Sequence, residues 1–150
     1  MKTNFLLLFS FFFLMEITLE SCKTTTYTAD KLPVKQLCFG NGGGFTGQEN
    51  AYTLLENGQL FSSNRLANSN EALPSIKVKK AKTLFSKYET LKLNELDFNQ
   101  PGNIYSFVEM KDSVGTHRIV WGATFTQKDS SLNTLKGFYD SLMKIVVKKD

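Results

Sequence analysis

Histidine occurs once in this chain, at position 117, and cysteine only twice, at positions 22 and 38. A zinc site needs several such ligands, so this inventory is too small to predict one. A Ser-His-Asp triad would have to use His117, and nothing in the sequence brings that residue to a serine and an aspartate. We therefore predict a non-enzymatic protein with no catalytic residues, no metal and no cofactor, in which His117 packs on a strand or is exposed from it.

Long apolar runs are also scarce. The longest extends from Phe5 to Met15, follows Lys2 and contains no charged residue. It is too short for a transmembrane helix, which needs about 20 residues. A positive charge followed by a short apolar stretch is typical of a secretory signal. We expect residues 1–21 to be a signal peptide, and we predict no membrane-spanning helix in the mature protein.

The end of this signal resembles a bacterial lipobox. Leu19 and Ser21 fit the pattern that precedes the lipidated cysteine, Cys22, whereas Glu20 replaces the small or apolar residue that is usual there. The resemblance implies that Cys22 becomes an acylated N-terminus, carrying chains such as palmitate that hold the protein on a membrane. Lys23 stands where an inner-membrane retention signal would have aspartate, so we expect an outer-membrane lipoprotein facing the periplasm. The alternative is an ordinary cleavable signal with an incidental cysteine.

The mature chain divides into a tether and one domain. Residues 22–32 are polar, rich in threonine and without apolar periodicity, which is typical of a flexible tether. Residues 33–150 are enough for a single domain that relies on its hydrophobic core. If Cys22 is acylated, Cys38 has no disulfide partner. Its apolar neighbours, Leu37 and Phe39, favour a buried small hydrophobic residue over a reactive thiol.

The formal net charge is +4, with lysines concentrated at positions 77, 79, 80, 82, 148 and 149. We interpret these lysines as solvated surface, and attraction to anionic lipid or to an acidic polymer is the alternative. No nucleic-acid-binding motif is present, so nucleic acid is not an expected partner. The expected partners are the membrane, through the N-terminal lipid, and an unidentified protein of the cell envelope.

Apolar periodicity predicts two helices, and runs of β-forming residues predict five strands. Residues 79–91 place Ala81, Leu84, Phe85 and Tyr88 on one helical face, and Leu132, Leu135, Tyr139, Leu142 and Val146 recur in the same way near the C-terminus. The predicted strands are 34–39, 51–55, 60–65, 104–111 and 116–121, with loops at 66–74 and 94–102. This βββ-α-ββ-α order predicts an α+β fold, in which an antiparallel sheet of four or five strands carries both helices on one face.

Half of the ten glycines lie between Gly40 and Gly47. The segment matches the nucleotide-binding pattern G-x-G-x-x-G, but that fingerprint needs a helix after it and here a strand is predicted. We therefore predict a shaped loop between the first two strands. It is either an architectural turn, which we favour, or a binding loop made of Gly42, Gly43, Gly44, Phe45, Thr46 and Gly47.

Three segments carry a resemblance to known proteins. Gly-Gly-Gly-Phe-Thr-Gly at 42–47, Pro-Gly-Asn-Ile-Tyr at 101–105 and Arg-Ile-Val-Trp-Gly at 118–122 resemble uncharacterised small lipoproteins of gram-negative bacteria, over about residues 37–147. This resemblance implies no particular activity. The lipobox and the lack of a catalytic set of residues lead us to expect a membrane-anchored, non-enzymatic binding or interaction module of unknown biochemical activity. The segment 43–47 is also similar to the Gly-Gly-Phe-Ala-Gly segment of emfourin-type inhibitors, with Thr46 in place of the alanine. That resemblance implies an alternative function, a proteinaceous inhibitor of a metallopeptidase that presents the glycine-rich loop.

Overall fold

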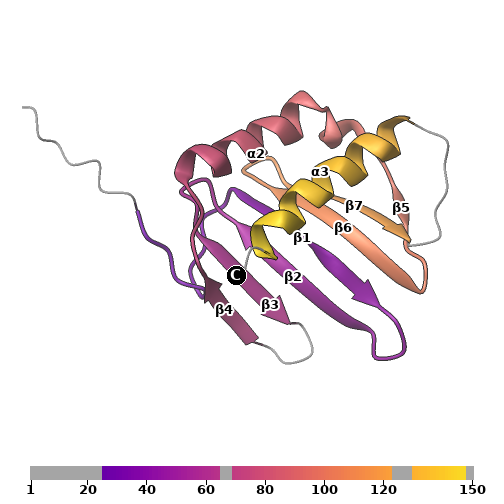
Figure 1. Ribbon diagram of the computed structural model, residues 1–150, viewed down its shortest axis with the longest axis horizontal. Helices are drawn as coiled ribbons and strands as arrows, with labels where there is room; N and C mark the ends of the chain where they lie inside the picture. The colour runs from indigo at the N-terminus through magenta and orange to yellow at the C-terminus, as the bar shows by residue number, and fades with distance from the viewer. Residues whose placement is uncertain (1–24, 65–68, 123–129, 148–150) are drawn as a thin grey trace, which may run out of the picture.

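A computed structural model describes residues 25–64, 69–122 and 130–147, which form an α+β fold. Two α-helices, α2 (Val78–Thr90) and α3 (Ser130–Val146), lie on one face of the sheet, as Figure 1 shows. The fold class and the placement of both helices on one face are therefore confirmed. The prediction of four or five strands is wrong, because the described residues form a sheet of seven.

The sheet is antiparallel except at one edge. Its strands are β1 (Gln36–Gly43), β2 (Gln48–Leu54), β3 (Leu60–Asn64), β4 (Ser69–Leu73), β5 (Asn99–Gln100), β6 (Ile104–Lys111) and β7 (Thr116–Gly122). Their spatial order is β4-β3-β2-β1-β6-β7-β5, and only β5 and β7 are parallel. A 3-10 turn, η2 (Leu93–Glu95), follows α2. The first strand of the chain, β1, therefore lies at the centre, between β2 and β6.

Two strands occupy segments that were predicted to be loops. β4 lies within 66–74 and β5 within 94–102. Neither sequence is rich in β-branched or aromatic residues, so local propensity gives no strand signal. Pairing with a neighbouring strand, β3 for β4 and β7 for β5, defines them instead.

The hydrophobic core lies between the sheet and the helices. α2 buries the four residues predicted to share its inner face, and α3 buries Leu132, Leu135, Phe138, Leu142 and Ile145. Alternate strand residues meet them from the sheet: Leu37, Phe39, Leu54, Leu60, Val108, Met110, Ile119 and Trp121. Side chains on a strand point alternately to the two faces, so the residues between these belong to the opposite face of the sheet. Among the described residues no helix has the length and hydrophobicity to cross a bilayer.

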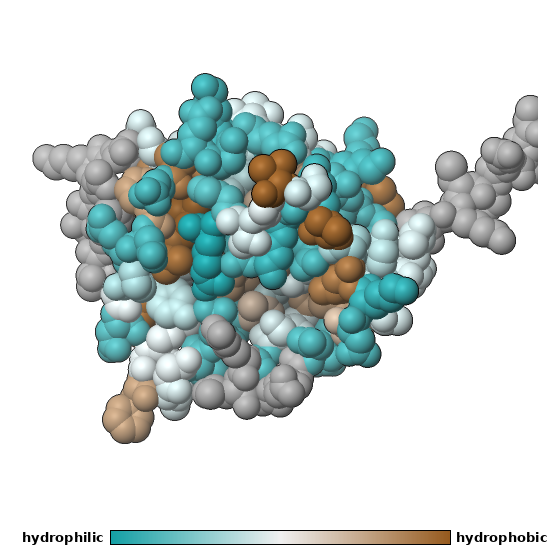
Figure 2. Space-filling model, turned by 180° about the vertical axis from the view of Figure 1, so that it is seen from behind, coloured by the Kyte–Doolittle hydropathy of each residue, from teal (hydrophilic) through white to brown (hydrophobic). Residues whose placement is uncertain are grey.

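Neither of the two described helices lies on the opposite face of the sheet, which we call the open face. It presents Cys38, Phe107, Glu109, Arg118 and other residues of the same alternation. Viewed from behind in Figure 2, the molecule is mainly hydrophilic with small, separate hydrophobic areas.

The segment before the domain is hydrogen-bonded to the turn between β2 and β3. Tyr27 donates its backbone N–H to Oε1 of Gln59 at 2.8 Å, and its carbonyl accepts from Nε2 of Gln59 at 2.9 Å. The side-chain amide of Asn57 donates to the carbonyl of Thr25 at 2.6 Å. Gln59 thus pairs with both backbone groups of Tyr27, as a neighbouring strand would. This contact falls within the predicted tether, whereas Cys22 lies outside the described residues.

Candidate functional site

The glycine-rich segment is partly strand and partly turn. Gly42 and Gly43 extend β1, and only residues 44–47 form the turn before Gln48 begins β2. The predicted loop is therefore longer than the observed one. Glycine and asparagine form strands poorly on their own, and here β1 is paired with β2 on one side and β6 on the other, which supplies its hydrogen bonds.

Three glycines in this segment have backbone angles that other residues rarely adopt. The φ values are 97° at Gly43, 76° at Gly44 and 62° at Gly47. The N–H of Gly44 donates to the carbonyl of Asn103 at 2.6 Å, and the N–H of Gly47 donates to the carbonyl of Gly44 at 3.2 Å. A left-handed backbone is accessible to glycine at little cost. These glycines therefore shape a tight hairpin and fix it to the loop before β6.

Phe45 lies at the tip of this hairpin and is fully exposed, at 107% of its reference surface. It packs against no part of the core. Ile104, which pairs with Gly43 at the base of the hairpin, is also 57% exposed. In Figure 1 the turn between β1 and β2 projects at the lower right, away from both helices. The molecule thus presents two large apolar side chains at one end of its sheet.

Gly42 makes room for a contact across β1. It pairs with Glu49 on β2 and with Tyr105 on β6, so the three residues form one row on the open face. Tyr105 donates its Oη–H to Oε2 of Glu49 at 2.7 Å. A Cβ on Gly42 would lie 2.6 Å from the Oη of Tyr105. The missing side chain at position 42 is what allows a β6 residue to reach a β2 residue over β1.

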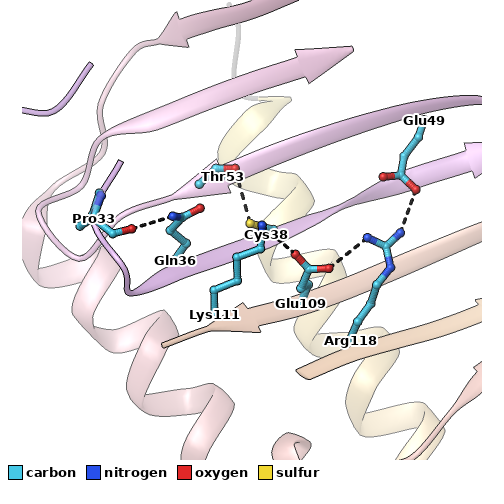
Figure 3. A network of polar contacts seen from close by, with 8 residues as sticks. All are labelled: Pro33, Gln36, Cys38, Glu49, Thr53, Glu109, Lys111 and Arg118. Carbon is cyan, nitrogen blue, oxygen red and sulfur yellow. Dashed lines mark hydrogen bonds and ion pairs between the residues drawn. The ribbon is translucent and has the colours of Figure 1, made fainter. Parts of the chain in front are cut away.

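Arg118 links three strands of the open face, as Figure 3 shows. Its Nη2 donates to Oε2 of Glu49 at 2.8 Å, and its Nη1 donates to Oε2 of Glu109 at 3.1 Å. Its guanidinium carbon lies 3.9 Å from the ring centroid of Phe107, a cation–π arrangement. The guanidinium is therefore held by two carboxylates and one aromatic ring.

Glu109 is the one buried charged residue of the described part of the chain, at 8% exposure. Its second oxygen, Oε1, lies 3.3 Å from Nζ of Lys111, so both carboxylate oxygens have a cationic partner. A shallow hollow of about 400 Å³ opens over these residues and is also lined by Ser63 and Asn70. The charges of its lining balance, because the two carboxylates of Glu49 and Glu109 face the two cations of Lys111 and Arg118. Among the described residues, every buried side-chain nitrogen or oxygen has a hydrogen-bond partner.

Cys38 lies beside this network and is buried, as predicted. Its Sγ is 3.5 Å from Oγ1 of Thr53. Burial raises the pKa of the Cys38 thiol, and this effect outweighs the hydrogen bond with Thr53, which lowers it. A raised pKa keeps the sulfur in the thiol form, which is not the nucleophilic form.

His117 lies on the helix-covered side of the sheet, with Ile119 and Trp121, as predicted. Its Nδ1 shares a hydrogen bond of 2.7 Å with Oη of Tyr88. Burial raises the pKa of the Tyr88 phenol well above its ordinary value. A second hollow, of about 430 Å³, opens beside this pair and contains no serine or cysteine among its described lining residues. The described residues also hold no group of three or more metal-ligating side chains.

Sequence reasoning identified the hairpin but missed the network on the open face. Glu49 and Arg118 are separated by 69 positions, so their contact has no local signature. The sequence did contain one indication of it. Gly40 and Gly42 are two positions apart, so both lie on the same face of a strand and leave space there for side chains of the neighbouring strands.

A comparison of the chain with protein-family models finds no match, and neither does a comparison with curated protein sequences.

Proposed function

We propose that this protein is a lipid-anchored, non-enzymatic binding module of the cell envelope that uses its β1–β2 hairpin to bind a protein. The observation that carries the proposal is the complete exposure of Phe45 at the hairpin tip. Aromatic residues, phenylalanine included, are enriched at the core of protein interfaces. Full burial of a phenylalanine against a partner contributes about 1.5–3 kcal/mol.

The position of the hairpin supports this role. β1 and β2 are central strands, and each is hydrogen-bonded to a neighbour on both sides. The bond from Gly44 to Asn103 also fixes the turn to the rest of the domain. A loop that is ordered before binding loses less conformational entropy on binding. Phe45 is therefore presented from a rigid support.

The polar groups of the domain support a binding role over a catalytic one. The charged side chains of the open face are paired with one another, and His117 is bonded to Tyr88. A general base or nucleophile would have to be available to a substrate in a plausible pose. The membrane part of the proposal rests on the sequence around Cys22. Lys23, which follows that cysteine, supports a location at the outer membrane, facing the periplasm.

A photo-crosslinking amino acid in place of Phe45 tests the interface in native cells. We expect it to form a covalent product with one envelope protein. Purified partner should then bind the Phe45→Ala variant about ten- to a hundredfold more weakly, the equivalent of losing one buried aromatic anchor. Val114 is the matched control, because it is 95% exposed on a different hairpin. Crosslinks that are absent at position 45, or identical at 45 and 114, would argue against this interface.

Inhibition of a thermolysin-like metallopeptidase is the second candidate, and the narrow, projecting hairpin favours it because such a shape can enter a cleft. Purified residues 23–150, in micromolar excess over a panel of these enzymes, should then reduce peptide hydrolysis. We expect Phe45→Ala to restore hydrolysis and Val114→Ala to leave the inhibition intact. Enzymes that stay fully active throughout would exclude this candidate, while the crosslinking result would stand.

A further inference from the structure

The N-terminal segment is hydrogen-bonded to the turn between β2 and β3, and this limits where a lipid on Cys22 can lie. The carbonyl of Thr25 accepts a hydrogen bond from Asn57, and Tyr27 is bonded twice to Gln59. Cys22 precedes Thr25 by three residues, which span at most about 11 Å. If Cys22 is acylated, the turn between β2 and β3 is therefore held close to the bilayer. Residues 25–32 of the predicted tether therefore add little to the distance by which the domain can move away from the membrane.

The N-terminal end of α2 lies beside the same turn. Ile76 donates its backbone N–H to the carbonyl of Gly58 at 2.9 Å, and α2 begins two residues later. The first turns of this helix carry four exposed lysines, which we call the lysine patch: Lys77, Lys79, Lys80 and Lys82. None of the four takes part in an ion pair among the described residues. Val78, 40% exposed, adds an apolar side chain between them.

The stability of α2 does not explain these lysines. Its first turn contains no acidic residue, and Lys77 at the N-cap makes no side-chain hydrogen bond to the helix. Positive charges near a helix N-terminus are unfavourable, because that end already carries partial positive charge. The one acid of the helix, Glu89, is paired with Lys35. The patch is therefore an uncompensated positive surface beside the segment that leads to the lipid.

The β1–β2 hairpin lies at the opposite end of the sheet. In Figure 1 the N-terminal segment joins the sheet at the left, and the hairpin projects at the lower right. β1 runs between these two ends, and its eight residues span about 25 Å. A membrane at the left end would leave Phe45 directed away from it.

We propose that the lysine patch binds the anionic lipid surface, so that the domain stands on the membrane with the Phe45 hairpin pointing outward. The orientation rests on the proposed lipid anchor, whereas the affinity of the patch for anionic lipid does not. Each lysine near an anionic surface strengthens binding about fivefold. The lipid anchor supplies stable attachment, and the patch selects one face of the domain.

Vesicle binding by residues 23–150, which lack Cys22, tests the patch alone. We expect binding to vesicles of phosphatidylcholine mixed with phosphatidylglycerol, and none to phosphatidylcholine alone. The double variant Lys79→Gln, Lys82→Gln should bind about 25-fold more weakly. Lys92→Gln with Lys144→Gln removes the same charge elsewhere and should have a much smaller effect. Equal weakening by both pairs, or no binding to the anionic vesicles, would overturn the patch as a lipid-binding surface.

Thiol labelling of the lipidated full chain on anionic vesicles tests the orientation. Phe45→Cys should react quickly with a membrane-impermeant reagent and Val78→Cys slowly, while the native Cys38 is buried and reacts little. Equal rates at the two positions would contradict the orientation. Incorporation of a palmitate analogue into wild type but not Cys22→Ala tests the anchor separately. Equal incorporation would remove the anchor from the proposed function and leave the vesicle result unaffected.

Discussion

Replacement of Gly40 by alanine is expected to lower the free energy of unfolding by about 3 kcal/mol or more. A Cβ at this position of β1 would overlap the backbone carbonyl oxygen of Asn50 and lie 3.0 Å from Cα of Ala51. Both atoms belong to the backbone of β2, which is also held by β3 along its other edge. They cannot rotate away as a side chain could, so the ladder itself would have to open. Urea denaturation followed by circular dichroism measures the change.

Gly137 is the matched control for this substitution. It lies in α3, and a Cβ added there would have no heavy atom of the described residues within 4 Å beyond its own helix backbone and chain neighbours. Gly137→Ala should raise the free energy of unfolding by about 0.5–1 kcal/mol, because alanine is the better helix former. The two glycines therefore predict opposite signs for one chemical change. A loss at Gly40 of less than about 1 kcal/mol, well below the cost of a backbone overlap, would mean that β1 and β2 can separate there.

Substitution of Arg118 by leucine is expected to cost about 3 kcal/mol of folding free energy. The change removes the cation shared by Glu49 and Glu109, whose side chains are only 13% and 10% exposed. Lys111 remains beside one oxygen of Glu109, whereas Glu49 keeps the neutral hydroxyl of Tyr105. An almost buried carboxylate without a cation is the source of the cost. Thermal or urea unfolding of the variant gives the value.

Two further variants separate this cost from the loss of one surface charge. Lys92→Leu breaks the pair with Glu95, in which both side chains are more than half exposed, and should cost less than about 0.5 kcal/mol. Glu49→Gln in the Arg118→Leu background should recover part of the loss, because it removes the unpaired charge. If the loss of folding free energy in the double variant equals the sum of the losses in Arg118→Leu and Glu49→Gln, the network does not act as a unit.

The helices were predictable because burial in this fold follows periodicity. Ala81, Leu84, Phe85 and Tyr88 recur at helical spacing, and all four are buried against the sheet. The strands 104–111 and 116–121 were predictable for a similar reason, since their alternation of side chains has a period of two. Both signals are local, and neither requires knowledge of a neighbouring element.

The rest of the fold and the open-face network depend on pairs that are distant in sequence. β4 contains Ser69, Asn70 and Glu71 and is a strand only because β3 lies beside it. Arg118 reaches Glu49 because three strands place them on one face and Gly42 leaves the space between them empty. A single sequence carries the alternation but not the order of strands. The hairpin could be located from its glycines, whereas the exposure of Phe45 could not.

The overlap that a Cβ at position 40 would cause also limits which substitutions this position can accept during evolution. Every amino acid that a single nucleotide change can introduce in place of glycine carries a Cβ, so each such step at position 40 meets the same backbone atoms. Gly44 and Gly47 differ, because a Cβ there would meet no heavy atom of the described part of the chain within 4 Å, and only the positive φ is restrictive. Asparagine tolerates that backbone region. Among descendants of this chain, we expect glycine to persist at position 40, whereas asparagine can replace glycine at positions 44 and 47.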